Sequence, residues 1–178
     1  MKPRAATLED AAAIAEIYAP FVTGSAVSFE TEPPDEAAMR ARIGAGGALY
    51  PWLVIEGEDG TILGYAYAAR FRDRPAYRFA VETSVYLRAE GRGRGLGASL
   101  YAALLAILAE QGFTQAIAAI SLPNAASVRL HEGLGFERAG TYRKVGWKFG
   151  EWHDVGLWQR SLAAAGAVPA EPRKPLVA

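Results

Sequence analysis

Apolar side chains near the start of the chain recur at the spacing of an amphipathic α-helix. The pattern is formed by Ile14, Ile17, Tyr18 and Phe21. Thr7 is suited to cap this helix, and Pro20 and Gly24 are expected to end it. After an extended, proline-containing loop at 28–34, Asp35 is expected to cap a second helix that runs to about Ile43.

Three segments with the character of β-strands come next. They cover residues 52–55, 62–69 and 77–87, and the turn at 58–60 joins the first two as a hairpin. Gly64, inside the second strand, indicates a bulge or the close approach of another backbone. The basic loop 70–75 leads into the third strand, which we expect to be the central one.

The second half of the chain combines helices and strands in a single unit. We expect a helix at 95–111 ended by Gly112, a strand at 115–121, a short helix at 124–134, and a strand pair at 136–147 and 152–160 turned at 149–151. This order predicts one α/β (α+β) domain over residues 3–161. The tail at 162–178, which contains prolines and little pattern, is expected to be loosely ordered.

Composition narrows the class of protein. The 178 residues carry a formal net charge of zero and no cysteine. The charge balance argues against binding to nucleic acid or an anionic membrane, and the lack of cysteine excludes disulfides, thiolate metal sites and a cysteine nucleophile. The start of the chain shows no secretory signal and no apolar run approaches the length of a membrane span, so a cytoplasmic protein is expected.

The segment Glu82–Tyr101 has the features of an anion-binding turn. An apolar strand leads into the basic, glycine-rich sequence Arg92–Gly97, which opens the helix rich in Ala and Leu. Glycines allow successive backbone N–H groups to converge, and the start of a helix adds unpaired donors and a positive dipole end. A phosphate or pyrophosphate fits this pattern, although a solvated, glycine-capped helix start would look similar.

Several motifs in this order resemble the GNAT family of acetyl-CoA-dependent N-acetyltransferases. The resemblance covers roughly residues 3–161 and rests on the strand, the turn Arg92-x-x-Gly95-x-Gly97, the following helix, and the segment from Asn124 to Phe136. The segments 50–54, 82–87, 121–124 and 150–159 are similar, more narrowly, to phosphinothricin and methionine sulfoximine acetyltransferases. Such enzymes acetylate the α-amino group of glutamate-like amino acids.

The resemblance implies the GNAT fold, with a mixed, mostly antiparallel sheet that is splayed at a bulge and flanked by helices. It also implies acetyl-CoA as co-substrate. The residues that match the family's CoA-binding positions are Val85, Tyr86, Leu87, Arg92, Gly93, Arg94, Gly95, Leu96, Gly97, Ala98 and Asn124. Asn124 has an equally good explanation as a helix cap.

Two residues are candidates for catalysis. Glu82 is a carboxylate inside an apolar strand, which is costly unless it is partnered or functional, and it would accept the proton of the substrate amine. Alternation along the strand also allows Glu82 to lie simply on an exposed face. His131 stands where many relatives carry a tyrosine that protonates the CoA thiolate. Three roles therefore remain open for His131: a general acid, a general base or a residue of the helix surface.

The acceptor site that the resemblance implies needs cations and donors for a glutamate-like substrate. The candidates are Phe29, Glu30, Arg72, Arg74, Tyr77, Glu82, Thr83 and Ser84, with Arg78 added if it points inward. His153, the only other histidine, has no metal-ligand spacing to His131, so no metal site is expected. The aromatic residues of the last strand pair favour a homodimer.

The residues favour a direct transfer of the acetyl group in a ternary complex, because there is no cysteine to form an acyl-enzyme. Three alternatives remain open: acetylation of another small amine, acetylation of a protein N-terminus, and a non-catalytic acyl-CoA sensor. A nucleic-acid role for the Arg–Gly turn is disfavoured by the zero net charge and by the lack of aromatics there.

Overall fold

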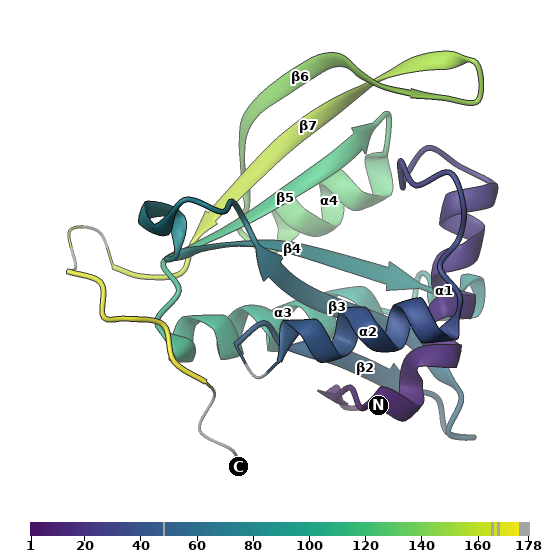
Figure 1. Cartoon of the computed structure of the whole chain (residues 1–178), viewed down its shortest axis with the longest axis horizontal. Helices are drawn as coiled ribbons and strands as arrows, with labels where there is room; N and C mark the ends of the chain where they lie inside the picture. The colour runs from purple at the N-terminus through teal and green to yellow at the C-terminus, as the bar shows by residue number, and fades with distance from the viewer. Residues whose placement is uncertain (48, 165, 167, 175–178) are drawn as a thin grey trace.

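The computed structural model describes residues 1–47, 49–164, 166 and 168–174. Figure 1 shows a sheet with helices on both faces and a long terminal hairpin. The strands are β1 (Arg4–Ala5), β2 (Trp52–Glu56), β3 (Ile62–Arg70), β4 (Ala80–Leu87), β5 (Gln115–Leu122), β6 (Glu137–Lys148) and β7 (Glu151–Ser161). The helices are α1 (Ala11–Thr23), α2 (Glu36–Gly46), α3 (Leu96–Gln111) and α4 (Ala125–Gly133).

The strand order is β1-β2-β3-β4-β5-β7-β6, and β4–β5 is the parallel pair among otherwise antiparallel neighbours. The expected mixed, mostly antiparallel sheet is therefore confirmed. The expected splay of the central strand is found between β4 and β5, whose pairing stops after Glu82–Ile117, whereas β3 and β4 pair without a register shift from Gly64–Leu87 to Arg70–Val81. Register shifts fall instead between β2 and β3 and between β6 and β7.

Each face of the sheet has its own apolar core. On one face, Leu100, Tyr101 and Leu104 of α3 are fully buried against the sheet. On the other face, α1 and α2 cover β2 and β3 through Ile14, Met39 and other buried side chains. Alternation along β4 therefore sends Val81, Thr83, Val85 and Leu87 toward α3, and Glu82, Ser84 and Tyr86 toward α1 and α2.

Three local boundaries differ from the sequence expectation. Pro20 lies inside α1 instead of ending it, because Val22 beyond it is buried and the N–H of Gly24 still bonds to the carbonyl of Pro20. The second helix continues past Ile43 to Gly46. Tyr77 is not in a strand: Pro75–Tyr77 forms a 3-10 turn, since Pro75 favours a turn conformation, and β4 starts only at Ala80.

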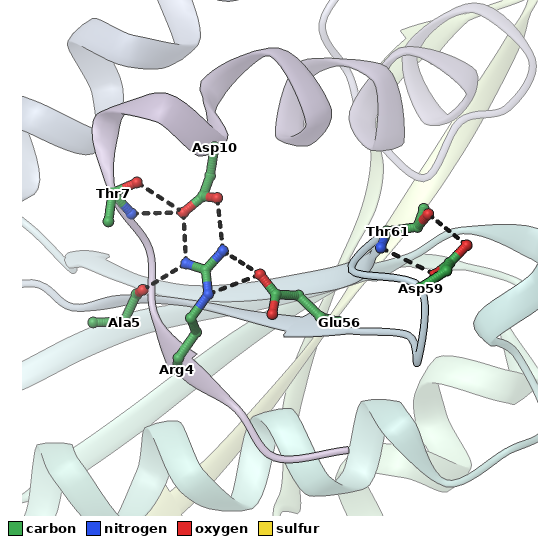
Figure 2. Close-up of polar contacts among 7 residues, drawn as sticks. All are labelled: Arg4, Ala5, Thr7, Asp10, Glu56, Asp59 and Thr61. Carbon is green, nitrogen blue, oxygen red and sulfur yellow. Dashed lines mark hydrogen bonds and ion pairs between the residues drawn. The ribbon is translucent and has the colours of Figure 1, made fainter.

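The N-terminal strand is held to its neighbours by Arg4 (Figure 2). Its guanidinium donates to both carboxylate oxygens of Asp10, at 2.8 and 2.9 Å, and to Glu56 at 2.9 Å. The hydrogen bonds from Arg4 hold the pKa of Asp10 below its usual value, against the effect of burial, and the N–H of Thr7 lowers this pKa further. This cluster joins the start of the chain and the first helical turn to β2. Figure 2 also shows Asp59 closing the β2–β3 turn on Thr61.

The described part of the C-terminal tail contacts the end of α3. The N–H of Arg173 bonds to the carbonyl of Gln111 at 2.9 Å, and Glu171 pairs with Arg78 at 2.7 Å. The expectation of a loose tail also extends to residues 165, 167 and 175–178, which lie outside the described residues.

Candidate active site

The sheet opens between β4 and β5. Pairing of these parallel strands is confined to Ala80–Gln115, Val81–Ala116 and Glu82–Ile117. Beyond this point β4 stays paired with β3 up to Leu87, and β5 stays paired with β7 up to Leu122, so the two strands diverge (Figure 1). Glu82 therefore stands at the apex of a V-shaped opening, beyond which the facing edges of β4 and β5 no longer pair with each other.

The glycine-rich turn lies at the wide end of this opening, between β4 and α3. Gly93 and Gly95 have φ values of +71° and +76°. A Cβ atom added at either position would have no heavy atom within 4 Å beyond its own residue and the two chain neighbours. Gly95 is the N-cap of α3 and has no side chain to bond the first helical N–H groups. The turn thus combines free donors, the positive end of the helix dipole and open space, as an anion site requires.

The two arginines of the turn differ in their surroundings. Both are exposed, but the guanidinium of Arg92 also lies over the ring of Phe21, 5.3 Å from its centroid. Gly97, in the first turn of α3, is buried close to Leu87: an added Cβ would lie 3.2 Å from a methyl group of Leu87. This close packing seats the start of α3 on the end of β4.

Glu82 is partly buried on the α2 face of the sheet, where it pairs across the strands with Ala69 and Ile117. Burial raises the pKa of its carboxyl group, and the positive charge of Arg72 offsets part of that rise. A carboxylate with a raised pKa at the point where a sheet opens is suited to accept a proton near neutral pH.

His131 lies on the other side of the sheet from Glu82 and is only 4% exposed. Its Nδ1 is 2.8 Å from the carbonyl oxygen of Ser127, and its Nε2 is 3.1 Å from the hydroxyl of Tyr101. Burial lowers the pKa of the imidazole, against the effect of the hydrogen bond to Ser127. The reading of His131 as a surface residue is therefore wrong.

Thr83 also faces α3. Its hydroxyl is 2.6 Å from that of Tyr101 and 3.2 Å from the carbonyl oxygen of Ile117. The side chain of Thr83 thus points away from Ser84 and Glu82, its neighbours in the predicted acceptor site. Asn124 caps α4, where its side-chain oxygen accepts a hydrogen bond from the N–H of Ser127 at 3.1 Å.

The loop between α1 and α2 is fixed by contacts from three directions. Arg42 of α2 donates twice to the carboxylate of Glu30, with both distances 2.8 Å, and the hydroxyl of Tyr18 donates to the same group at 2.9 Å. Lys148 of β6 donates to the carbonyl oxygens of Val22 and Ser28. Glu30 is therefore held by protein groups, and its hydrogen bond from Arg42 is the main reason that its pKa lies below the usual value.

Phe29 at the tip of this loop packs on the backbone of Gly146 in β6 and lies 6.0 Å, ring to ring, from His153. At Gly146 any Cβ would collide with the ring of Phe29. His153 itself contacts the carbonyl oxygen of Lys148 at 3.0 Å. The β6–β7 hairpin therefore supports the predicted acceptor loop.

The remaining predicted acceptor residues lie in the segment before β4. A shallow cavity of about 440 Å³ is lined by Phe71, Arg72, Asp73, Arg74 and Tyr77. Arg72 and Arg74 are both exposed, and the guanidinium of Arg72 lies 5.1 Å from the ring of Phe71. Arg78 turns away: it stacks on Phe79 at 4.2 Å and pairs with Glu171, so it is not an inward cation.

A second cavity, of about 500 Å³, lies under α2 on the same face as Glu82. Its floor is aromatic, with Trp52 stacked on Tyr67 at 4.2 Å. The lining also includes Tyr18, Met39, Arg42, Tyr65, Ala69 and Arg70. Ala69 is the cross-strand neighbour of Glu82, so this cavity adjoins the predicted base.

Three residues at the site were not identified from the sequence: Tyr101, Arg42 and Lys148. Tyr101 carried a signal, since a tyrosine hydroxyl within a helix of Ala and Leu needs a buried partner. Arg42 and Lys148 had no such signal, because their partners lie 12 to 126 positions away along the chain.

In the described part of the chain, no group of three or more His, Cys, Asp or Glu residues could hold a metal ion. Within the same residues, no helix has the length and apolar character needed to cross a membrane.

The comparisons with known proteins agree with this geometry. A family model described as an acetyltransferase (GNAT) domain matches residues 4–157. The chain is 43% identical over 170 residues to phosphinothricin N-acetyltransferase of Streptomyces viridochromogenes, covering 96% of this chain and 90% of that protein. It is 38% identical over 167 residues to the L-methionine sulfoximine/L-methionine sulfone acetyltransferase of Pseudomonas paraeruginosa, covering 93% and 97%.

A solved structure gives the same result for the fold. The GNAT superfamily phosphinothricin acetyltransferase of Sinorhizobium meliloti, in complex with AcCoA, superimposes with a TM-score of 0.91 at 40% identity, covering 96% of this chain and 93% of that one. The predicted fold and family are confirmed. The chain belongs to the GNAT family of acetyltransferases.

Proposed function

We propose that this protein transfers an acetyl group from acetyl-CoA to the α-amino group of a small, glutamate-like amino acid. The observation that carries the proposal is the position of Glu82 at the apex of the β4–β5 opening, with an open anion-binding turn at the other end. The relatives named for phosphinothricin and methionine sulfoximine acetylation support this class of acceptor.

In this proposal the CoA pyrophosphate binds the turn formed by Arg92, Gly93, Arg94, Gly95, Leu96, Gly97 and Ala98. The pantetheine arm lies along the free edge of Val85, Tyr86 and Leu87, where β4 has no β5 partner. This places the thioester near the apex of the opening. A free backbone N–H of this β4 edge, at the thioester, would stabilise the oxyanion of the tetrahedral intermediate.

Glu82 is the proposed general base. It takes one proton from the α-ammonium group, directly or through a water molecule, and the neutral amine attacks the thioester carbonyl. The C–N bond forms, the tetrahedral intermediate collapses, and the C–S bond breaks to release CoA as a thiolate. His131 is the proposed source of the proton that the thiolate takes up. Its pKa below the usual value makes it a ready proton donor once it has become charged.

The acceptor has an α-carboxylate and a second acidic or strongly polar group. Arg72 and Arg74 are exposed cations in the cavity before β4, with Tyr77 beside them, and the charge of Arg72 acts on Glu82. We propose that at least one arginine of this cavity binds a carboxylate, with Phe29, Ser84 and the backbone of Thr83 completing the site. Glu30 acts in this scheme through its ion pair with Arg42, which shapes the loop.

Thiol release from acetyl-CoA tests this proposal. The acceptors are phosphinothricin, methionine sulfoximine, methionine sulfone, glutamate and a peptide with a free N-terminus. Saturable release with one or more of the first three, giving an N-acetylated product by mass spectrometry, is expected. Turnover confined to the peptide, or binding of acetyl-CoA with no turnover, would replace the proposal by one of the other GNAT activities.

We also propose that the protein is a homodimer joined through the β6–β7 hairpin. The hairpin exposes five large apolar residues: Tyr142, Val145, Trp147, Phe149 and Trp152. Because β6 is an edge strand of the sheet, the hairpin also offers unpaired backbone groups to a second copy. Light scattering coupled to gel filtration should give twice the 19.0 kDa chain mass, and Trp147→Glu should give a monomer. A wild-type monomer would exclude this interface.

A further inference from the structure

A continuous chain of hydrogen bonds runs through the α3 face of the protein. It starts at the carbonyl oxygen of Ser127, 2.8 Å from Nδ1 of His131, and continues from Nε2 to the hydroxyl of Tyr101 at 3.1 Å. From there it passes to the hydroxyl of Thr83 at 2.6 Å and ends at the carbonyl oxygen of Ile117, 3.2 Å away. Tyr101 is fully buried, and Thr83 and His131 are 2% and 4% exposed.

Both ends of this chain can only accept hydrogen bonds, because both are backbone carbonyl oxygens. Each of the four contacts is a hydrogen bond only if one proton lies between its two atoms, so the chain needs four protons in all. A neutral imidazole and two hydroxyl groups supply three, and an imidazolium and two hydroxyl groups supply four. The chain is one proton short when His131 is neutral and is complete when His131 is charged.

The position of the open contact follows from the distances. Nδ1 lies 2.8 Å from the carbonyl oxygen of Ser127, which can only accept, and 3.3 Å from the hydroxyl of the same residue, so the shorter contact assigns the first proton to Nδ1. Nε2 of the neutral ring then accepts from Tyr101. Tyr101 then accepts from Thr83 across the shortest contact, 2.6 Å. The longest contact, 3.2 Å between Thr83 and Ile117, is the one left without a proton. Ile117 is the strand partner of Glu82, so the open contact lies at the apex of the β4–β5 opening.

We propose that Tyr101 and Thr83 conduct a proton between His131 and the apex of the β4–β5 opening, which gives the buried histidine its access to the reacting groups. The inference rests on the proposed function, in which a proton must be returned to the departing thiolate. Neither ring nitrogen of His131 is free for direct contact, because each already faces a protein partner. Tyr101 is thus a positioning residue that acts through its two neighbours.

The transfer balances one proton at each step. A proton that arrives at the oxygen of Thr83 forms an O–H bond there, while the original proton of Thr83 moves to Tyr101. The proton of Tyr101 moves to Nε2 of His131, which becomes an imidazolium. The reverse sequence returns one proton from His131 to the apex, where the thiolate of CoA accepts it and becomes a thiol. No other bond forms or breaks, and no oxidant or reductant is needed.

The surroundings of His131 contain few other titratable groups. From α3 it faces Tyr101, whose own pKa is raised mainly by burial and also by the negative charge of Glu82 on β4. Phe136, which precedes β6, packs against its ring. On its own helix the neighbour is Glu132, which accepts a hydrogen bond from Trp158 of β7 at 3.2 Å. Tyr101 is therefore the one titratable side chain that the described residues place in hydrogen-bond contact with the ring.

The first test does not depend on activity. The chain contains two histidines, so His153→Gln leaves a single imidazole whose ring protons report the pKa of His131 by NMR. In that background, Tyr101→Phe removes the acceptor of the charged ring. The pKa of His131 should fall by about one unit, since a hydrogen bond to a charged group is stronger than one to a neutral group. An unchanged or increased pKa would overturn the assignment of the proton on Nε2.

The second test separates proton conduction from simple packing. Thr83→Val has nearly the same shape but breaks the path. We expect kcat to fall at least tenfold with little change in either KM, and Thr83→Ser to restore it. Combining Thr83→Val with His131→Gln should lower kcat no further than the worse single variant, because the residues act as one unit. Thr114→Val, which removes a hydroxyl that bonds the carbonyl oxygen of Phe79 just before β4, is the matched control.

Normal kcat in Thr83→Val, failure of Thr83→Ser to restore it, or additive losses in the double variant would each exclude conduction through Thr83. Equal melting temperatures of the variants by circular dichroism establish that folding is not the cause. If the wild-type protein shows no transfer to any amine, the proposed function fails, while the NMR titration still decides whether the hydrogen-bonded chain sets the pKa of His131.

Discussion

Replacing Lys148 by Met should both destabilise the protein and weaken acceptor binding. Lys148 is 7% exposed, and its ammonium group donates to the carbonyl oxygens of Val22 and Ser28 at 2.6 and 2.7 Å. Methionine retains most of the side-chain volume but has no donor. The substitution therefore removes the polar link between the β6–β7 hairpin and the loop that carries Phe29 and Glu30, and leaves only the packing of Phe29 on the hairpin.

The size of the effect follows from these two contacts. Hydrogen bonds to a charged group contribute roughly 1.5–3 kcal/mol each, so about 3–6 kcal/mol of interaction is lost. Part of this loss is offset because the buried ammonium no longer has to be desolvated, the effect that also lowers the pKa of Lys148. We expect a net loss of about 2–3 kcal/mol, which for a chain of this size lowers Tm by about 4–12 °C.

The assay combines thermal unfolding with steady-state kinetics. The KM of the acceptor should rise about tenfold, equivalent to about 1.4 kcal/mol of loop ordering, while the KM of acetyl-CoA stays unchanged because the glycine-rich turn lies on other elements. Lys144→Met removes the same charge from an exposed position on the same strand and serves as the control. A Tm within about 1 °C of wild type, with an unchanged acceptor KM, would refute this reasoning.

Four further predictions concern β4, its neighbour β3 and the glycine-rich turn. Glu82→Gln should lower kcat by about 10²–10⁴-fold and remove the acidic limb of the pH profile of kcat/KM. In the wild-type protein the pKa that this limb reports should lie above the ordinary glutamate value of about 4.3. A limb retained in the variant would exclude Glu82 as the base. Because the folded protein holds this proton more tightly than the unfolded chain, wild-type stability should decline as pH rises through the folded pKa of Glu82, and urea unfolding should show no such decline in Glu82→Gln. Gly64→Ala would place a Cβ 2.8 Å from the carbonyl oxygen of Tyr86, so it should cost about 1–3 kcal/mol in urea unfolding; a neutral effect would mean that β4 can shift. Gly95→Val forces a β-branched residue to a φ of +76° and should raise the KM of acetyl-CoA about tenfold or more, with the KM of the acceptor as the internal control.

Much of the fold followed from local patterns in the sequence. Asp35 caps α2 by accepting a hydrogen bond from the N–H of Ala38, and Gly112 ends α3 with a positive φ, as expected. Gly64 indeed marks a close approach, since its missing Cβ leaves room for β4. These features depend on residues within a few positions of one another, or on a glycine at a position whose backbone conformation or close packing leaves no room for a side chain. Tyr77 was misplaced because the turn at Pro75 starts within a run that otherwise alternates like a strand.

The sequence by itself determined the strand, the glycine-rich turn and the helix that follows it, because strand alternation, glycine conformations and helix starts are local properties. The tertiary structure alone decided where β4 and β5 part, and so which residue stands at the apex. Strand alternation already places Glu82 and Thr83 on opposite faces of β4, but only the tertiary structure decided which helices cover each face and that Thr83 meets His131 through Tyr101. The physical reason is that burial, pKa and hydrogen-bond partners depend on contacts between residues far apart in the chain, and these contacts exist only once both cores have packed against the sheet.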